Sequence, residues 1–226
     1  MITIRSVLCP VDFSACAGRA LGHAAMVARR FEAPLTVLYA AERMPTSQTP
    51  FAGYAAIPLP PVPVDELREE MRRFAEPIIA AAPAPRFLVR EGHPITEIAA
   101  EAEGMTDGVV VMGTHGRTGI ERVWLGSVTE RVLRRVRCPV LTVPPGASVP
   151  VRAAHDAAAA PYKTIICAVD FSDASIRAVE HALTWAQEAN ARVIFLHVLE
   201  PQLDASTMLV AGHFSVPEYF GYVKKD

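Results

Sequence analysis

The sequence predicts an α/β fold, in which a five-stranded parallel sheet is wound on both faces by helices and is followed by a partial β-α-β repeat. Three observations lead to this prediction. Short β-branched runs alternate with amphipathic segments along the chain. The opening β-α-β pattern occurs twice, and a glycine-rich segment directly follows one of the apolar runs.

Apolar runs predict strands that are buried on both faces, at Val7–Val11, Leu35–Ala40, Phe87–Arg90, Val109–Met112 and Val140–Val143. The segments between these runs predict helices, the first after Ser14 and the others at Asp65–Ala82, Pro94–Glu103 and Ser127–Arg135. Ser14 is a natural N-cap for the first helix, and Pro77 should kink the second. Met44–Val64 is rich in proline and without periodicity, which predicts a long loop.

Residues 5–42 are repeated as residues 163–200, at a constant offset of 158 and without a gap. Identical pairs are spread over the alignment and include Cys9/Cys167, Asp12/Asp170, Phe13/Phe171, Ser14/Ser172 and His23/His181. So many matches indicate an internal duplication. The chain therefore divides into a complete unit at 1–146, an Ala/Pro-rich linker at 147–161 and an incomplete second unit at 162–226.

The composition argues against several classes of protein. The formal net charge of −2 gives no general attraction to nucleic acid or to an anionic membrane. No apolar run approaches the roughly 18 residues of a membrane span, and the N-terminus has no basic-then-apolar signal, so we expect a cytoplasmic protein. The four cysteines form no CxxC pair, which predicts reduced thiols packed as small apolar side chains.

The segment GTHGRTGIERVWLGSVTE, residues 113–130, is the strongest functional signal. It follows the fourth predicted strand at the sheet edge where open α/β folds bind ligands. Its glycines let backbone approach a ligand, and the helix starting at Ser127 offers free N–H groups and the positive end of its dipole. Arg117 adds a charge and Thr129 a hydroxyl, while Asp12 leaves the first strand at the same edge as a carboxylate for Mg²⁺. These residues suggest a site for a polyphosphate.

Purely structural interpretations of the same residues are also open. Ser127 and Glu130 match the capping box S-x-x-E, which needs no ligand. Gly113 is explained equally well as the end of a strand, and Asp12 as an Asx-turn residue. His115 is more readily a loop histidine than a catalytic one, because no partner carboxylate or nucleophile is identifiable.

The stretch MGTHGRTGIERVWLGSVTERVLRRVRCPVLTV resembles the universal stress protein family. It contains that family's nucleotide signature, G-x2-G-x9-G-[ST], as Gly113, Gly116, Gly126 and Ser127. VLCPVDFS, REGHPITEIAAEA and DGVVVMG resemble the same family in the same order. The resemblance implies a Rossmann-like sheet of strand order 3-2-1-4-5 that binds ATP, and homodimers that pair through the last strand, Val140–Val143.

The resemblance also implies where the nucleotide contacts lie. The base would lie near the ends of the first two strands, at Pro10, Val11, Asp12 and Ala40. The phosphates would lie on the glycine loop and the next helix, at Gly113, His115, Gly116, Arg117, Gly126, Ser127, Val128 and Thr129, with Mg²⁺ at Asp12. The second unit reproduces only Asp170 and Ser172 of this site. We therefore expect one ATP per chain, and a second unit that docks on the first or on another chain or else is mobile.

Three functions compete at this point. The first is an ATP-binding module of the cytoplasmic stress response, without catalytic residues, whose occupancy alters association or conformation. The second is a slow ATPase in which Mg²⁺ bound at Asp12 is the active part. The third is an interaction protein that binds no nucleotide and uses the glycine loop only as a helix cap. No SGGxDS-like or HxGH-like loop is present, which argues against the enzyme.

Overall fold

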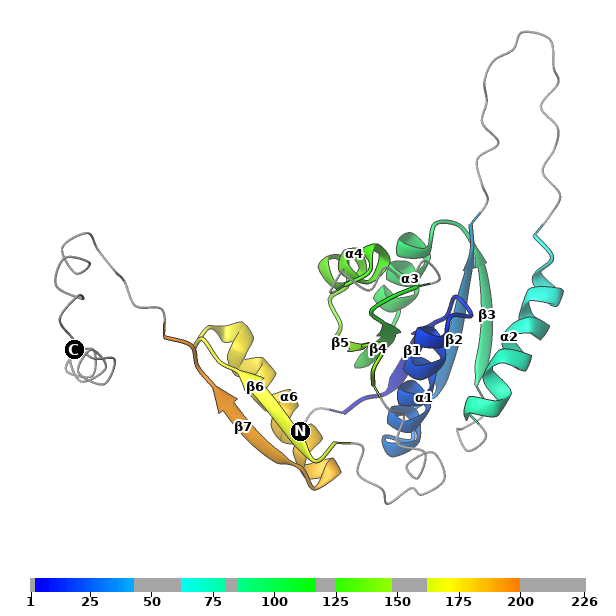
Figure 1. Cartoon of the computed structure of the whole chain (residues 1–226). Coiled ribbons are helices and arrows are strands. Elements are labelled where there is room, and N and C mark those ends of the chain that lie inside the picture. Colours follow the sequence, from blue (N-terminus) through cyan, green and yellow to red (C-terminus); the bar gives the residue numbers. More distant parts are fainter. Residues whose placement is uncertain (1–2, 43–61, 80–84, 117–124, 148–161, 200–226) are drawn as a thin grey trace, which may run out of the picture.

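The computed structural model describes residues 3–42, 62–79, 85–116, 125–147 and 162–199. Its main sheet is parallel and five-stranded, with the strand order β3-β2-β1-β4-β5, as the sequence predicts (Figure 1). The strands are β1 Ser6–Pro10, β2 Leu35–Ala41, β3 Arg86–Glu91, β4 Gly108–Gly113 and β5 Val140–Val143. Each lies within two residues of its predicted bounds.

Helices cover both faces of this sheet. They are α1 Ala15–Arg30, α2 Val64–Ile79, α3 Pro94–Glu103 and α4 Ser127–Arg135. On one face, Val7 and Val37 pack with Leu21 of α1 and Met71 of α2. On the other face, strand residues one position further along pack with α3 and α4 in a second cluster, Leu8, Leu38, Val110, Ile98 and Val132. This alternation follows from the two-residue period of a strand, and it makes the sheet apolar on both sides.

The predicted second helix is present, with Pro77 inside it. Its described part ends at Ile79, so the predicted end at Ala82 and most of the predicted loop Met44–Val64 lie outside the described residues. The predicted cap of the first helix is confirmed, because the Ser14 hydroxyl accepts a hydrogen bond from the Ala17 N–H at 3.1 Å.

A second β-α-β unit follows, made of β6 Thr164–Ala168, α6 Asp173–Ala189 and β7 Arg192–Leu196. Its local geometry reproduces that of the first unit at the offset of 158. β1 pairs with β2 with Val7 opposite Leu35, and β6 pairs with β7 with Ile165 opposite Val193. The left-handed residues also correspond, because Phe13 and Phe171 have φ angles of 63° and 65°, and Glu32 and Asn190 have φ angles of 51° and 47°.

The turn after the first strand is built the same way in both units. The Ser14 N–H donates to Asp12 Oδ1 at 3.1 Å, and the Ser172 N–H donates to Asp170 Oδ1 at 3.0 Å. The Ser172 hydroxyl also donates to this carboxylate, at 2.6 Å. These hydrogen bonds, with that from the Ser172 hydroxyl as the largest cause, lower the pKa of Asp170 to about 2.

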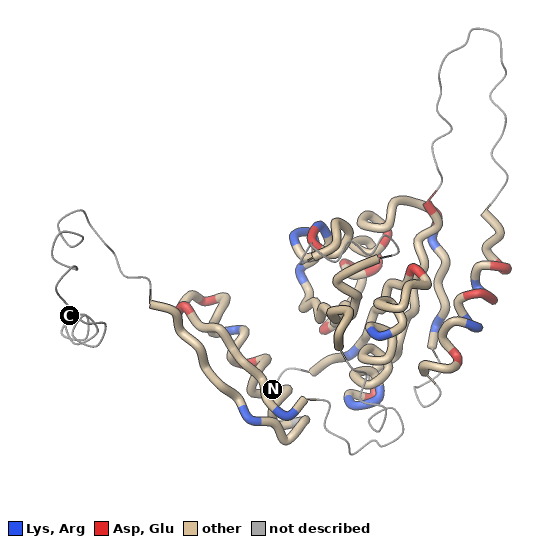
Figure 2. The backbone as a smooth tube through the Cα atoms, in the orientation of Figure 1, with Lys and Arg blue, Asp and Glu red and all other residues tan. Residues whose placement is uncertain are grey.

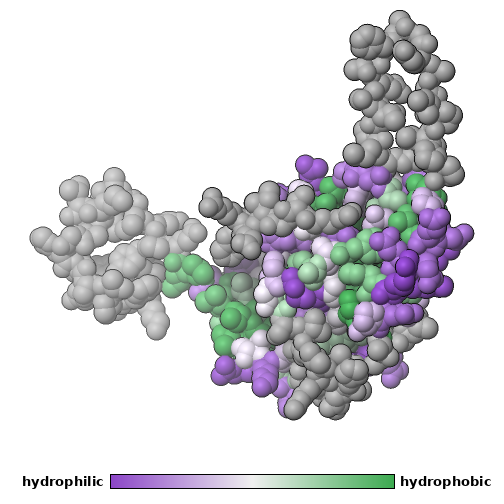
Figure 3. All heavy atoms as spheres, turned by 45° about the vertical axis from the view of Figure 1, so that its right-hand side comes forward, coloured by the Kyte–Doolittle hydropathy of each residue, from purple (hydrophilic) through white to green (hydrophobic). Residues whose placement is uncertain are grey.

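The two units differ in what covers their sheets. Leu8 and Leu38 are 1% and 0% exposed beneath α3 and α4, whereas Ile166 and Leu196, at the equivalent positions, are 65% and 49% exposed. Figure 3 shows the hydrophobic surface that gathers over this second unit. Equivalent sequence positions therefore contribute very differently to the core.

The second unit contacts the first through aromatic side chains, and docking on the first unit is one of the outcomes expected from the sequence. A hydrogen bond of 3.2 Å joins His23 Nδ1 on α1 to the Tyr162 hydroxyl. The Trp185 ring of α6 lies 6.0 Å from Phe31 and 5.9 Å from Tyr162 between ring centroids. Burial lowers the pKa of His23 and raises the pKa of Tyr162 to about 12, so both groups are neutral near pH 7.

The cysteines behave as the sequence predicts. All four are free thiols, and Cys9, Cys16 and Cys167 are buried. Burial raises the pKa of the Cys9 thiol, so this residue lacks the thiolate character of a nucleophile. Among the described residues, no helix has the length and apolar character needed to cross a bilayer.

The matched pair Leu8 and Ile166 gives a test of the packing. We expect Leu8→Ala to lower the free energy of unfolding by about 2–5 kcal/mol, because it leaves a cavity under α3 and α4. Ile166→Ala should change it by less than about 0.5 kcal/mol, because that side chain is already exposed. Urea unfolding followed by circular dichroism measures both, and equal losses would contradict the described burial.

Candidate functional site

The candidate site lies at the carboxyl edge of the main sheet, where β1 and β4 end side by side (Figure 1). Pro10 pairs with Leu38, so Asp12 lies level with Ala40 of β2. Leu8 pairs with Val110, so Val11 lies level with Gly113. The register therefore gathers the residues predicted for the base side of the site, Pro10, Val11, Asp12 and Ala40, beside the start of the glycine loop.

Asp12 and Gly116 make the closest approach across this edge. The interpretation of Asp12 as an Asx-turn residue is confirmed by its hydrogen bond from the Ser14 N–H. Its other oxygen, Oδ2, lies 2.8 Å from the point that a Cβ atom would occupy on Gly116. A side chain at position 116 would therefore collide with the carboxylate, and glycine allows the loop to run directly beside it.

The start of the loop is tied to β5 and α1. A Cβ atom on Gly113 would lie 2.8 Å from the Cys16 sulfur, so Gly113 has a packing role beyond ending the strand. The Thr114 N–H donates to the Val143 carbonyl at 3.0 Å, and the Cys16 thiol donates to the same carbonyl at 3.4 Å. His115, which is half-buried, has its Nδ1 2.9 Å from the Thr114 hydroxyl oxygen. This geometry gives His115 a hydrogen-bond partner within the loop.

Gly126 closes the loop and begins α4. Its N–H donates to the Thr114 carbonyl at 2.6 Å, and a Cβ atom on Gly126 would lie 2.8 Å from that oxygen. Gly126 is the N-cap, and no side chain caps the helix. The capping-box interpretation of Ser127 and Glu130 is therefore wrong, because Ser127 is already the first helical residue and Glu130 pairs instead with Arg134 at 3.1 Å.

The first turn of α4 presents backbone N–H groups at the same edge. Ser127, Val128 and Thr129 open this helix, and first-turn N–H groups have no acceptor within their own helix. The Ser127 hydroxyl is exposed. The Thr129 hydroxyl is buried and donates to the Gly113 carbonyl at 2.8 Å. Thr129 thus holds α4 against the end of β4, and what it offers toward a ligand is its N–H.

Charge at the edge comes from Asp12 and the positive end of the α4 dipole. Arg117, the cation predicted for phosphate, lies outside the described residues. Among the residues that the structure describes, no group of three or more His, Cys, Asp or Glu side chains could hold a metal ion by itself.

Sequence reasoning missed Thr114 and Cys16. Thr114 sits inside the G-x2-G spacing, where the pattern accepts any residue. The Cys16 thiol reaches a carbonyl 127 positions away in the chain, so no local pattern indicates that contact. Both residues hold the loop through the Val143 carbonyl, and no sequence pattern indicates this role for either of them.

The chain is an open, doubly wound α/β protein. A glycine loop and a helix N-terminus lie together at the carboxyl edge of its sheet. A sequence model of the universal stress protein family matches residues 3–144 and again residues 161–218. The chain therefore belongs to the universal stress protein family.

Individual proteins are similar to this chain in sequence or in fold. A universal stress protein of Methanocaldococcus jannaschii is 32% identical over 143 residues, which are 62% of this chain and 81% of that protein. The structure of a universal stress protein from Archaeoglobus fulgidus covers 96% of this chain and 74% of its own, with a TM-score of 0.55 and 22% identity, which shows a shared fold. Another from that organism, in complex with dAMP, covers 63% of this chain and 99% of its own, with a TM-score of 0.41 and 26% identity.

Substitution of the two hydroxyl residues in the first turn of α4 should change the free energy of unfolding by different amounts. We expect Thr129→Val to lower the free energy of unfolding by about 1–3 kcal/mol, because it leaves the Gly113 carbonyl without its donor. Ser127→Ala should cost less than about 0.5 kcal/mol, because Ser127 is exposed and caps nothing. Thermal or urea unfolding measures both, and a larger loss for Ser127→Ala would restore its role as a cap.

Proposed function

We propose that this chain binds ATP at the carboxyl edge of its main sheet and acts as a nucleotide-dependent module of the stress response. The observation that carries the proposal is the approach of Gly116 to Asp12, with the open first turn of α4 at the same edge. A glycine that lets the backbone run beside a carboxylate, together with a helix N-terminus at the same edge, is suited to bind phosphate and its cation.

The proposed contacts follow from the groups at the edge. The phosphates lie on the N–H groups of Ser127, Val128 and Thr129, with the Ser127 hydroxyl as an added donor. Mg²⁺ is held between the phosphates and the Asp12 carboxylate, in keeping with its preference for few protein ligands. The adenine ring lies toward Ala40 and Val11. Arg117 completes the phosphate contacts.

Binding, rather than turnover, is the function we propose. A general base must lie within hydrogen-bond reach of an attacking water, and the two candidates among the described residues of this edge already have hydrogen-bond partners. Asp12 accepts the hydrogen bond of its own turn, and His115 lies against Thr114. ATP occupancy would alter the association or the conformation of the chain.

Ser127 gives the sharpest test of this site, because its loss should leave the fold intact. We expect the purified chain to bind Mg·ATP in calorimetry, and Ser127→Ala to weaken the affinity by about tenfold through the lost phosphate contact. Asp12→Asn should weaken binding more in Mg²⁺ than in EDTA. Glu130→Gln, in the same turn of α4, is the control and should not weaken it. No binding of ATP by the unmodified chain would refute the proposal.

We also propose that two chains pair through β5, which lies at the edge of the main sheet. Val110 donates to the Pro139 carbonyl and Thr114 to the Val143 carbonyl, so alternate residues of β5 face β4. The backbone groups of Val140 and Thr142 consequently face the open edge.

A proline at position 142 tests this pairing without breaking the contact with β4. Thr142→Pro removes an outward N–H donor, so we expect it to convert a dimer to a monomer in light scattering. Thr142→Val keeps that donor and should remain dimeric. Circular dichroism checks that both variants keep their helices, and a monomeric unmodified chain at micromolar concentration would overturn the interface.

A further inference from the structure

A cavity of about 830 Å³ opens at the amino edge of the main sheet, which is the edge opposite the glycine loop. Its walls come from the segment that precedes β1, from the start of β4, from the ends of α3 and α4 with the turns that follow them, and from one side of α6. Every residue that lines it is described. The cavity therefore joins the two units and is separate from the proposed ATP site.

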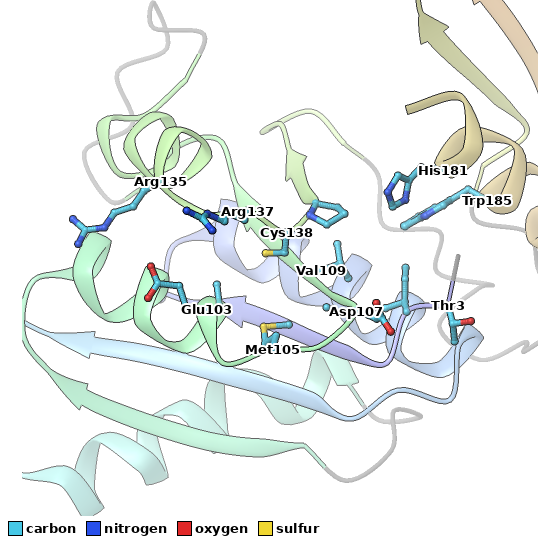
Figure 4. A pocket seen from close by; sticks show the side chains of 14 residues that line it. Thr3, Glu103, Met105, Asp107, Val109, Arg135, Arg137, Cys138, His181 and Trp185 are labelled. Atoms are coloured by element: carbon cyan, nitrogen blue, oxygen red, sulfur yellow. The ribbon is translucent and has the colours of Figure 1, made fainter. Parts of the chain in front are cut away.

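The lining changes in character from one end to the other (Figure 4). Arg135 and Arg137 lie at one end, and His181 and Trp185 of α6 lie at the other. Between them are apolar and sulfur-bearing side chains, Met105, Cys138 and Val109. An elongated cavity with a basic end and an apolar, aromatic end matches a molecule that is itself amphiphilic.

The apolar part of the cavity is firmly built. Ile4 and Val109 are buried in the core beneath it. Met105 packs directly over Gly108, where a Cβ atom would collide with the Met105 side chain. Trp185 is held by its ring contacts with Phe31 and Tyr162. These contacts fix the floor and the aromatic wall in place.

The charges favour an anion at the basic end. Asp107 is neutralised by Arg5, with 3.4 Å between Nε and Oδ2. The remaining charged groups at the basic end are the carboxylate of Glu103 and the guanidinium groups of Arg135 and Arg137. Arg135 and Arg137 take part in no ion pair within the described part of the chain. The blue segments at α4 in Figure 2 mark this basic side of the molecule. A guanidinium group is well suited to a carboxylate or phosphate, because it donates two parallel hydrogen bonds.

We propose that this cavity binds an amphiphilic anion. Its carboxylate or phosphate head pairs with Arg137 and Arg135, and its apolar tail lies along Met105 and Val109 toward Trp185. Because the tail contacts α6 while the head contacts α4, the ligand holds the second unit against the first. This site does not depend on the proposed binding of ATP.

Two probes with alkyl tails of nearly equal length and opposite head-group charges test the proposal, decanoate and decyltrimethylammonium. The full chain carries Trp124→Phe, so that Trp185 is its one tryptophan. We expect a saturable change in Trp185 fluorescence with decanoate and at least tenfold weaker binding of the cation. Equal affinities would mean binding of the tail alone, for example on the exposed apolar face of the second unit. That result, or the absence of a saturable change with decanoate, overturns the proposal.

A matched pair of arginines locates the head group. Arg137→Gln should weaken decanoate binding by about tenfold, as expected for one lost charged contact. Arg131→Gln removes an exposed arginine of α4 that does not line the cavity, and it should leave the affinity unchanged. Equal effects of the two substitutions would show a general response to net charge and would also overturn the site.

Discussion

The pairing of β1 with β4 at the centre of the sheet is the constraint on which the rest of the structure depends. Both strands are apolar on both faces, with Val7 and Val109 packed in one core cluster and Leu8 and Val110 in the other. Such strands are stable only where helices cover both sides. Their central position brings the ends of the two strands together, so a purely hydrophobic requirement places Asp12 beside Gly113 and its loop.

The sequence was sufficient for the elements and for the location of the site. Periodicity located every strand of the main sheet, and Ser14 and Pro94 marked helix starts that the structure confirms. It also predicted the start of α4 at Ser127, but it was not sufficient to predict how that start is capped. A capping box needs a hydroxyl on the N-cap residue, and whether Ser127 or Gly126 takes that place depends on backbone angles that the loop imposes. The role of Thr129 likewise depends on a carbonyl of another element.

Comparison of the two units distinguishes structural features that depend on neighbouring residues from those that depend on distant parts of the chain. Phe13 and Phe171 adopt the same left-handed conformation, and the Asx turns around them match. These features need only neighbouring residues, so the repeated sequence reproduces them. Burial needs partners from elsewhere in the chain, so Leu8 and Ile166 differ even though their strands pair in the same register. A sequence repeat therefore predicts local backbone geometry well, but it does not predict which side chains are buried in a core.

Helix α1 has one end at the candidate site and the other at the second unit. It begins beside the Asp12 turn, where Cys16 packs against Gly113. It ends at Phe31, whose ring meets Trp185. A helix of 16 residues is a stiff rod of about 24 Å. A tilt of about 5° at its first turn moves its last turn by about 2 Å, which is comparable to the gap between neighbouring side chains. A small rotation of α1 at the candidate site would therefore displace the contact between Phe31 and Trp185 at its other end.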